Sequence, residues 1–466
     1  MCGVFGIWSG EEDVARLTYF GLQALQHRGQ ESAGIAVGDG KTVTTVKNLG
    51  LVTQVFEETD LKSLPGKVAI GHTRYSTTGA SRAWENAQPH MSSIGRQLIA
   101  LAHNGNLVNT SELRSGLINE GVHLSSTTDS EAIASLIGEF TKRTSHIREG
   151  ISETMKLIRG AYAVVLVTES ALYAFRDPQG IRPLCIGELA DGHGFVVSSE
   201  TCGLDIVGAK FVREVDPGEV IKISEDGLET LDSGTGERKS MCMFEYVYFA
   251  RPDSEFDGDS MYQVRHAMGE CLAKEAPVEA DMVMGVPDSG VPAAAGFASV
   301  SGIPYGDGLA KNRYVGRTFI APSQLQRQLG IRLKLNPLRH QIEGKRLVVV
   351  DDSIVRGNTM KQLVKMLREF GAKEVHMRIS SPPVMWPCFY GIDIDSRDQL
   401  IGAQKTVEEI RKHIGADSLA YISLEGMVGS TVHTADQFCL ACFNGDYPVE
   451  VSPSMAGNKL AFEGAH

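Results

Sequence analysis

The chain has 466 residues, too many for one ordinary hydrophobic core, so its length predicts two domains. Hydrophobic residues make up 42% of the chain and charged residues 22%, as in globular proteins, and no apolar run reaches the ~18 residues of a membrane span. The net charge of -12 argues against a general nucleic-acid binder, and eight cysteines are too few for a disulfide scaffold of this length.

The amino terminus carries a candidate nucleophile, Cys2. The opening residues MCGVFGIWSG lack the basic segment of a secretory signal, so we expect a cytoplasmic protein whose cysteines serve chemistry or metal binding. If Met1 is removed, Cys2 combines its thiol with an α-amine whose pKa near ~8 suits a base at neutral pH. The alternative is that Cys2 is a small buried hydrophobic residue, which is a common role of free cysteine.

Polar loops follow several predicted strands in the first 110 residues. Short apolar runs at 4–7, 68–72 and 98–103 predict strands, and residues 14–25 have the apolar spacing of a helix. Functional residues gather in loops at strand ends. The polar segments here are HRGQESAGIA at 27–36, GHTRYSTTG at 71–79 and HNGNL at 103–107.

Together with Cys2, these segments resemble the glutaminase domain of class II glutamine amidotransferases, a family of N-terminal nucleophile hydrolases. The resemblance covers roughly residues 2–235 and implies a four-layer αββα sandwich. It makes Cys2 the nucleophile that forms a glutamyl thioester. It also assigns the side-chain amide of Asn104 and the backbone N-H of Gly105 to an oxyanion hole, where preplaced donors stabilise developing negative charge.

Two further residues match glutamine-binding positions of that family. Arg74 matches the arginine that binds the glutamine carboxylate, for which a planar guanidinium is well shaped, although an ordinary ion pair is the alternative. Asp129 matches the acid that binds the glutamine α-ammonium. Residues Thr128 to Glu131 also fit a capping box ahead of a helix over 132–140. The two interpretations of Asp129 are compatible, since a helix start can position the acid.

A polar, glycine-bearing break, LDSGTGERK at 231–239, is the predicted domain boundary. Before it, strands are predicted over 161–167, 171–175 and 195–198, and Cys185 and Cys202 match no motif and are expected in the core. We therefore expect a glutaminase domain at 2–235, a second domain at 240–445 and a carboxyl-terminal tail at 446–466.

The second half begins with a predicted strand at 282–286, followed by the loop PDSGVPAA, which contains Ser289. A polar, basic segment at 311–339 is either a solvated loop or a lid that closes over a polyphosphate. The basic residues of that segment are Lys311, Arg313, Arg317, Arg327, Arg332, Lys334 and Arg339.

The stretch RLVVVDDSIVRGNT at 346–359 predicts a ligand site. Residues 347–350 suit a buried parallel strand, and Asp351 and Asp352 follow at its carboxyl end, where ligands bind in open α/β sheets. The turn at 353–359 leads into a helical pattern whose first N-H groups favour an anion. Carboxylates can bind the diol of a sugar, and backbone N-H groups can bind a phosphate. Their combination here indicates a site for a phosphorylated ribose.

Two alternatives remain for this stretch on spacing alone. Nucleotide hydrolases place a similar acidic strand beside a GxxxxGK[ST] loop, but the nearest candidate, GIAVGDGKT at 34–42, has one residue too many between its glycines. The other is a plain strand-turn-helix with a solvated acidic pair.

The segment DDSIVRGNT closely resembles the phosphoribosylpyrophosphate (PRPP) signature of type I phosphoribosyltransferases. The resemblance implies a mainly parallel sheet in which Asp351 and Asp352 hold the ribose hydroxyls. It implies that Ser289, Asp351 and Asp352 surround Mg²⁺, which needs few protein ligands beside substrate phosphates. It favours the lid for 311–339, so that neutralising Arg313 or Arg317 should raise KM for PRPP and spare glutamine hydrolysis. The loop residues expected to bind PRPP are Ser353, Arg356, Gly357 and Thr359.

Four cysteines of the second half, Cys242, Cys388, Cys439 and Cys442, form a candidate metal site. The pair in FCLACF has CxxC spacing, which suits zinc, an iron-sulfur cluster or a redox pair, and spacing does not separate these. A chance pair of core cysteines is the remaining alternative.

The segment EYVYFARPDS at 245–254 extends the match to the amidophosphoribosyltransferase family over nearly the whole chain. All four cysteines match the branch of that family that carries a 4Fe-4S cluster linking the two domains. Relatives with the cluster often have a propeptide before the cysteine, whereas only Met1 precedes Cys2 here, so we expect methionine removal to complete maturation.

The family resemblance implies a transferase of the pentosyltransferase class. Glutamine would yield glutamate and ammonia, and ammonia would pass along an enclosed path to C1 of PRPP, releasing pyrophosphate and forming 5-phosphoribosylamine, the first committed step of purine (IMP) biosynthesis. A homotetramer and feedback inhibition by purine nucleotides such as AMP or GMP are further expectations. The alternatives are a different class II amidotransferase and a non-catalytic PRPP or purine-nucleotide sensing module.

Overall fold

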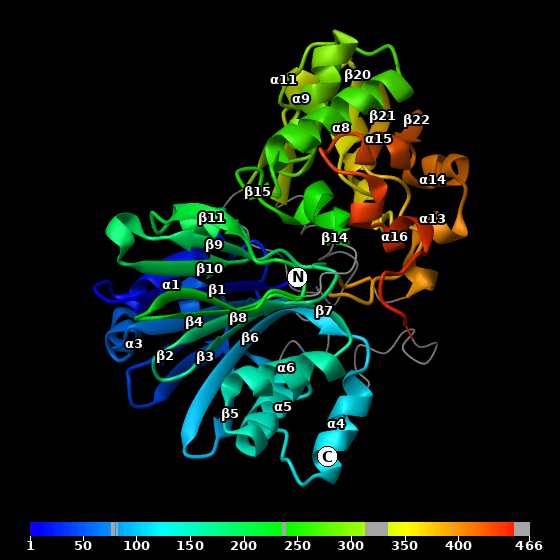
Figure 1. Ribbon diagram of the computed structural model, residues 1–466. Coiled ribbons are helices and arrows are strands. Elements are labelled where there is room, and N and C mark those ends of the chain that lie inside the picture. Colours follow the sequence, from blue (N-terminus) through cyan, green and yellow to red (C-terminus); the bar gives the residue numbers. More distant parts are fainter. Residues whose placement is uncertain (76–79, 81–82, 235–238, 313–333, 395, 452–466) are drawn as a thin grey trace.

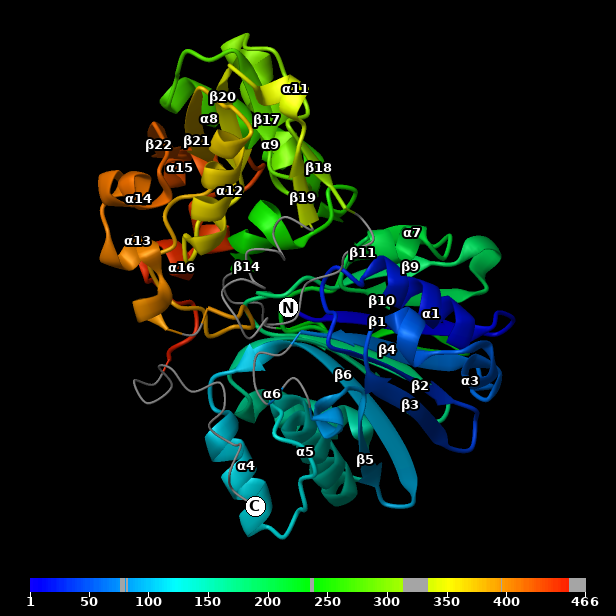
Figure 2. The ribbon, with the colours of Figure 1, turned by 180° about the vertical axis from the view of Figure 1, so that it is seen from behind.

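The computed structural model describes residues 1–75, 80, 83–234, 239–312, 334–394 and 396–451. Figure 1 shows two regions: a larger one with two sheets, which contains the first half of the chain, and a smaller one with a single main sheet covered by helices. The amino terminus lies where the two regions meet, as the view from behind in Figure 2 also shows.

The first region contains two antiparallel sheets. Their strands are rich in small and β-branched residues, which suits a surface buried on both faces. One sheet has the order β11 (Lys210–Glu214), β9 (Cys185–Glu188), β10 (Gly194–Ser198), β1 (Gly3–Ser9), β4 (Val68–Arg74), β2 (Ser32–Gly38) and β3 (Val43–Leu49). The other has the order β13 (Gly227–Asp232), β12 (Val220–Ser224), β8 (Leu172–Arg176), β7 (Gly160–Val167), β6 (Gln97–Leu107) and β5 (His90–Ile94).

Helices cover the outer face of each sheet. A core between the sheets joins side chains such as Val4 and Val165, and each sheet has a second core on its other face. The helices on the first sheet are α1 (Val14–Ala24), α2 (Val52–Val55), α3 (Glu58–Lys62) and α7 (Cys202–Asp205). Those on the second are α4 (Thr110–Asn119), α5 (Asp129–Thr144) and α6 (Ile147–Leu157). The expected αββα sandwich is therefore confirmed.

The second region is built on a parallel sheet in the order β17 (Met282–Gly285), β20 (Arg346–Asp351), β21 (Glu374–Ile379) and β22 (Ser418–Tyr421). Alternate residues of β20 enter different cores: Val348 and Val350 pack with α8 (Met261–Glu275) and α9 (Gly290–Ser301), whereas Leu347 and Val349 pack with α12 (Asn358–Glu369) and α14 (Val407–Ile414). Both faces are covered, so the parallel α/β class is confirmed.

Shorter elements complete the two regions. Strand β14 (Met241–Cys242) pairs in parallel with β23 (Phe438–Cys439), and a π-helix at Glu245–Phe249 follows β14. The others are β15 (Glu255–Phe256), β16 (Asp259–Ser260), β18 (Leu309–Lys311), β19 (Leu335–Pro337), α11 (Arg339–Ile342), α13 (Ile401–Gln404), α15 (Leu424–Val428), α16 (Ala441–Asn444) and 3-10 turns at Trp84–Asn86, Ala190–Gly192, Arg397–Gln399 and Ala435–Gln437.

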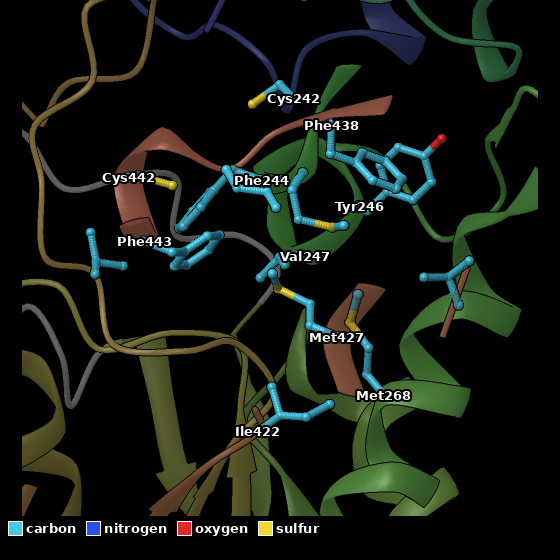
Figure 3. Packing of buried hydrophobic residues seen from close by; sticks show 14 of the residues in the cluster. Cys242, Phe244, Tyr246, Val247, Met268, Ile422, Met427, Phe438, Cys442 and Phe443 are labelled. Atoms are coloured by element: carbon cyan, nitrogen blue, oxygen red, sulfur yellow. The ribbon is translucent and has the colours of Figure 1, made fainter. Parts of the chain in front are cut away.

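One hydrophobic core is shared by the two regions. Met1, Val108 and Ile181 of the first region pack in the same cluster as the buried residues of the second. Figure 3 shows part of this cluster, in which the rings of Phe244 and Phe443 stack 6.1 Å apart and Cys242 and Cys442 lie at its edge. The two halves are therefore joined by packing as well as by the chain.

The predicted strands are present, whereas the predicted capping box at Thr128 is not. Every strand expected around the candidate sites is present, with ends displaced by at most four residues. The capping box at Thr128 is wrong: the Thr128 hydroxyl accepts from the Glu131 amide, but the Glu131 carboxylate binds Ser125 and Ser126 instead. Within the described residues, no helix is both long and apolar enough to cross a membrane.

Candidate active sites and a cysteine-lined cavity

Cys2 lies at the start of β1, where two sheets place it beside the ends of β4 and β6. Its amide N-H donates to Oδ1 of Asn104, 3.2 Å away, and its Sγ lies 3.4 Å from the Tyr75 carbonyl oxygen. The side chain of Arg28 holds the Cys2 carbonyl oxygen at 2.8 Å. Burial raises the pKa of the Cys2 thiol, so a base is needed to make it a nucleophile.

Asn104 and Gly105 lie next to Cys2 on β6, as an oxyanion hole requires. The Nδ2 of Asn104 is buried and has no hydrogen-bond partner among the described residues. Gly105 has a φ of +149°, and a Cβ there would lie 2.0 Å from the Ala161 carbonyl oxygen, so only glycine fits. An unpaired buried donor next to a nucleophile is the arrangement that stabilises an oxyanion.

Asp129 and Arg74 line the same small cavity. Asp129 starts α5, and its Oδ2 accepts from the Leu107 amide at 3.0 Å, while its Oδ1 lies 3.8 Å from His103. Arg74 ends β4, is 2% exposed, and lies 4.0 Å from Glu31. The cavity measures about 10 Å³, and its described walls are Cys2, Arg74, Tyr75, Gln88, His103, Gly105, Thr128, Asp129 and Ser130.

The second candidate site lies at the carboxyl end of β20. Asp351 and Asp352 meet Ser289 there: the Ser289 hydroxyl donates to Asp352 at 2.6 Å. Burial and the neighbouring charge of Asp352 raise the pKa of Asp351 well above its usual range. The carboxylates and the hydroxyl are oxygen donors of the kind that Mg²⁺ prefers.

The turn after Asp352 opens α12, as expected. Gly357 is the residue before the helix and has a φ of +77°, in the left-handed region that favours glycine. All of the predicted PRPP residues from 351 to 359 line one cavity of about 510 Å³, together with Phe244, Tyr248, Phe249 and Ile392, Asp393 and Ile394. Arg356 and Thr359 are exposed at its edge.

The expected lid falls mostly outside the described residues, including Arg313, Arg317, Arg327 and Arg332. Its two described ends are paired, since β18 and β19 form a short antiparallel ladder. Lys311 of this ladder forms an ion pair with Asp288 of the 287–294 loop. Lys311 and Lys334 also line a second, larger cavity of about 740 Å³ that lies between the regions, with Ser289, Arg265, Tyr248 and His27 among its walls.

The four candidate metal cysteines converge on one closed cavity. Cys242 and Cys439 are paired on the neighbouring strands β14 and β23, and all four cysteines line the cavity together with Arg182. Burial raises the pKa of the Cys242, Cys439 and Cys442 thiols. Within the described part of the chain, no three ligands lie close enough for a single metal ion.

Residues 388–394 connect all three sites, which the sequence did not indicate. Cys388 begins the segment at the cysteine cavity, and Gly391 lies against Gly105, with a Cβ there 3.1 Å from the Gly105 carbonyl carbon. Asp393 lines the PRPP cavity and lies 3.5 Å from the hydroxyl of Tyr75, whose backbone touches the Cys2 sulfur. The two catalytic candidates therefore share a wall.

Sequence reasoning missed the residues that hold these sites together. Arg28 lies inside the HRGQESAGIA segment, but the sequence predicted no role for it. In the structure it connects Cys2 to Glu200 and to Glu245, the latter in the second region. Arg182 and Tyr390 were also missed. Their signal could only be three-dimensional, because they act through long-range contacts to backbone atoms.

Comparison with known proteins finds two family models, one in each half of the chain. Residues 72–205 match the model of a glutamine amidotransferase domain, and residues 258–380 match that of a phosphoribosyl transferase domain. A curated amidophosphoribosyltransferase of Synechococcus elongatus is 53% identical over 99% of this chain and 94% of its own length. That of Bacillus subtilis is 48% identical over 97% of this chain and 94% of its own length.

Solved structures give the same relationship. The glutamine PRPP amidotransferase of B. subtilis, in complex with ADP and GMP, superposes with a TM-score of 0.90 at 47% identity and covers 97% of this chain and 99% of its own. A structure described as the allosteric regulatory enzyme of purine biosynthesis matches with the same TM-score and identity. The chain belongs to the amidophosphoribosyltransferase family, whose members use glutamine to aminate PRPP in purine biosynthesis.

Proposed function

We propose that Cys2 is the nucleophile of the glutaminase reaction and that the α-amine left after removal of Met1 is its base. Support comes from the geometry around Cys2: the nitrogen that would become this amine lies 3.2 Å from Asn104 Oδ1, and the sulfur lines the same cavity as Gly105. The amine accepts the thiol proton, Cys2 forms the glutamyl thioester and ammonia leaves. Water then releases glutamate.

The other residues of this site bind and orient glutamine. Asn104 Nδ2 and the Gly105 N-H donate to the oxygen that becomes negative, and the orphaned Nδ2 is the observation that carries this assignment. Arg74 binds the glutamine carboxylate. Asp129 binds its α-ammonium, with its carboxylate oriented by the Leu107 amide and by Ser130.

In the second site, Asp351 and Asp352 hold the ribose hydroxyls of PRPP, while Ser353, Arg356, Gly357 and Thr359 bind its 5-phosphate at the start of α12. The carboxyl end of a parallel strand and a helix amino terminus support this pairing of diol with phosphate. Ser289, Asp351 and Asp352 would hold Mg²⁺, whose chemistry here is to offset the charge of the departing pyrophosphate.

Cys242, Cys388, Cys439 and Cys442 hold a 4Fe-4S cluster in this proposal. The support is the single cavity that all four cysteines line, which is bounded by both halves of the chain. When bound, the cluster ties these segments together. Burial among Tyr390, Tyr447 and Pro387 limits access of oxygen and water to it.

The remaining parts of the proposal concern organisation and control. The glutaminase domain covers 2–235, the phosphoribosyltransferase domain 240–445 and the tail 446–466, and the protein is a cytoplasmic homotetramer. Purine nucleotides inhibit it. The cavity of about 740 Å³ has suitable chemistry for one, since lysines at 311 and 334 suit phosphates and the rings of Tyr248 and Phe249 suit a base.

The test is pyrophosphate release from PRPP with either glutamine or ammonia as the nitrogen donor. Cys2→Ala should lose glutamine-dependent activity by about 10⁴-fold or more and keep ammonia-dependent activity. Cys185→Ala, a buried cysteine outside the site, is the matched control and should retain both. Glutamine-dependent turnover that survives in Cys2→Ala would contradict the assignment.

The cluster is tested by analysis of anaerobically purified protein. Iron and sulfide in equal amounts, with the broad visible absorption of a cluster, are the expected result. Zinc without iron or sulfide would contradict the assignment while leaving the glutaminase and PRPP sites untouched.

A further inference from the structure

Arg182 is a fully buried cation at the wall of the cysteine cavity. It comes from the glutaminase half, in the connection between β8 and β9, and its side chain is 0% exposed. It is the one charged side chain among the described residues that line the cavity with the four cysteines. A buried guanidinium needs a compensating negative charge, because desolvation of an uncompensated ion costs several kcal/mol.

The carboxylate nearest to Arg182 is largely used by another arginine. Glu245 lies 3.5 Å from Arg182, but it binds Arg28 through both oxygens, at 2.7 and 3.1 Å. The second buried carboxylate of this network, Glu200, also binds Arg28, at 2.5 Å. Arg182 therefore shares the Glu245 carboxylate with Arg28, which binds it more closely. Four thiolates on an iron-sulfur core would add negative charge on the other side of Arg182, since all four cysteines line the same cavity.

Arg182 also fixes the segment that carries one of the cysteines. Its Nε and Nη2 both donate to the Tyr390 carbonyl oxygen, at 2.9 and 2.6 Å. The Tyr390 amide N-H in turn donates to the sulfur of Cys388, at 3.4 Å. One peptide segment thus contacts the guanidinium through its carbonyl and the cysteine sulfur through its amide.

The same segment touches the oxyanion strand of the glutaminase site. The Phe389 carbonyl oxygen accepts from the side-chain amide of Asn106 at 2.9 Å, and Gly391 packs on Gly105. A Cβ on Gly391 would lie 3.1 to 3.3 Å from the carbonyl carbon, the carbonyl oxygen and the Cα of Gly105. A displacement of residues 389–391 would therefore press on the backbone of Gly105, which carries the proposed oxyanion donor.

We propose that Arg182 is a positioning residue with two linked tasks: its charge stabilises the cysteine-held cluster, and its two hydrogen bonds to Tyr390 hold residues 388–391 against the oxyanion strand. This inference rests on the proposal that the four cysteines hold an iron-sulfur cluster. It assigns Arg182 no contact with glutamine or PRPP. The integrity of the cluster and the competence of the glutaminase site depend on the same side chain.

The experiment separates the charge of Arg182 from its two hydrogen bonds to the Tyr390 carbonyl oxygen. Arg182→Gln removes the charge, and Arg182→Lys keeps the charge but loses the planar pair of donors. Arg378→Gln is the matched control, because Arg378 on β21 is also buried but donates to the carbonyl oxygens of Ala276 and Met377 and to the Ser418 hydroxyl, and it does not line the cysteine cavity. The readouts are iron and sulfide content, the rate at which visible absorbance bleaches in air, the reduction potential of the cluster, and the ratio of glutamine-dependent to ammonia-dependent activity.

In Arg182→Gln, we expect bleaching about tenfold faster than in the parent protein and a more negative potential, because a second-sphere change of this kind alters metal affinity by tenfold or more and loss of a positive charge disfavours the reduced cluster. In Arg182→Lys, the potential should stay near that of the parent while the activity ratio falls about tenfold. Arg378→Gln should leave the potential and the ratio unchanged.

Either variant is able to overturn the inference. A folded Arg182→Gln with the bleaching rate and potential of the parent would remove the electrostatic task. If Arg182→Gln does not fold, Arg182→Lys decides: a parental activity ratio would overturn the proposed link. Absence of iron and sulfide from the parent protein would instead overturn the cluster assignment, and this inference with it.

Discussion

The glutaminase site and the PRPP site differ in how much of each is in place without substrate. Cys2, Arg74, Asn104 and Asp129 are all buried, and the cavity between them measures about 10 Å³. At the other site Asp351 is half-buried, Arg356 and Thr359 are exposed, and the cavity measures about 510 Å³. One site is held closed by two sheets, and the other is an open crevice at the edge of one sheet.

The difference reflects the chemistry of the two half-reactions. Stabilising an oxyanion needs donors that are fixed in advance, which strands β1, β4 and β6 supply. Binding PRPP needs room for two charged groups and a cation, with several ligand oxygens supplied by the substrate itself. Among the described residues the glutaminase cavity is accordingly far smaller, about 10 Å³ against about 510 Å³.

The preformed site should be the more sensitive of the two to loss of one donor. Asn104→Ala should lower kcat for glutamine by about 10²- to 10³-fold, because its buried, unpartnered Nδ2 is the proposed side-chain donor to the oxyanion. Turnover with ammonia in place of glutamine should be unchanged and serves as the internal control. A loss of glutamine turnover smaller than about threefold would show that Asn104 has no such role.

The open site should respond to a single change less strongly. Asp352→Asn removes one charge from the acidic pair but keeps groups that bind Ser289 and Ser353, so KM for PRPP should rise about tenfold to a hundredfold. Asp226→Asn, in an exposed turn of the first half, is the control. Hydrolysis of glutamine without PRPP should not change. An equal loss of both activities would mean that the variant damages the fold.

The two sites should also differ in their response to pH. Burial and the charge of Asp352 raise the pKa of Asp351, so this carboxyl holds a proton to a higher pH than usual and must lose it to bind Mg²⁺ and the ribose. KM for PRPP in the ammonia reaction should therefore rise as the pH falls through the raised pKa. Asp351→Asn should remove this dependence. A pH profile of the same shape in Asp351→Asn would exclude Asp351 as its source.

A change in the buried ion pairs between the two sites should alter the free energy of unfolding more than the turnover rate. Burial alone would raise the pKa of Glu200, but His27 and Arg28 beside it lower that pKa overall. A lowered pKa stabilises the fold above the ordinary carboxyl pKa of about 4.3, and the effect is lost as pH falls through the lowered value. Glu200→Gln should lower the free energy of unfolding at pH 7 by about 3 kcal/mol.

Chemical denaturation at pH 7 and in acid measures this effect. The difference between Glu200→Gln and the parent should shrink in acid. Glu58→Gln is the matched control, because Glu58 pairs with Arg16 at the surface and such pairs contribute little. Similar losses in the two variants would argue against a special role for the buried network.

Local patterns predicted the elements of both sites well. The run at 347–350 is β20, the turn at 353–359 opens α12, and the apolar runs of the first half are strands, because burial imposes a period on the sequence. The chemistry proposed for Cys2 and for Asp351 came from family motifs. The side chain of Glu131 was misjudged, because Ser125 and Ser126 compete for it and only the folded turn brings them near.

What could not be predicted are the contacts between the halves. Arg28 reaches Glu245 across more than 200 positions of the chain, and Arg182 reaches Tyr390 in the same way. No sequence periodicity marks such residues. Arg182 acts through a backbone carbonyl, a group that every residue has, and Arg28 acts through a carboxylate far away in the chain. The roles of Arg28, Arg182 and residues 388–394 therefore follow only from the folded structure.

The hydrophobic cluster that contains Met1, Val108, Ile181 and Phe443 has a practical consequence for anyone who wishes to divide this polypeptide. A fragment ending near residue 235 would expose its apolar share of that cluster to solvent, and so would the complementary fragment. Co-expression of both fragments, rather than purification of either by itself, is the route by which a split version of this enzyme should be recovered intact.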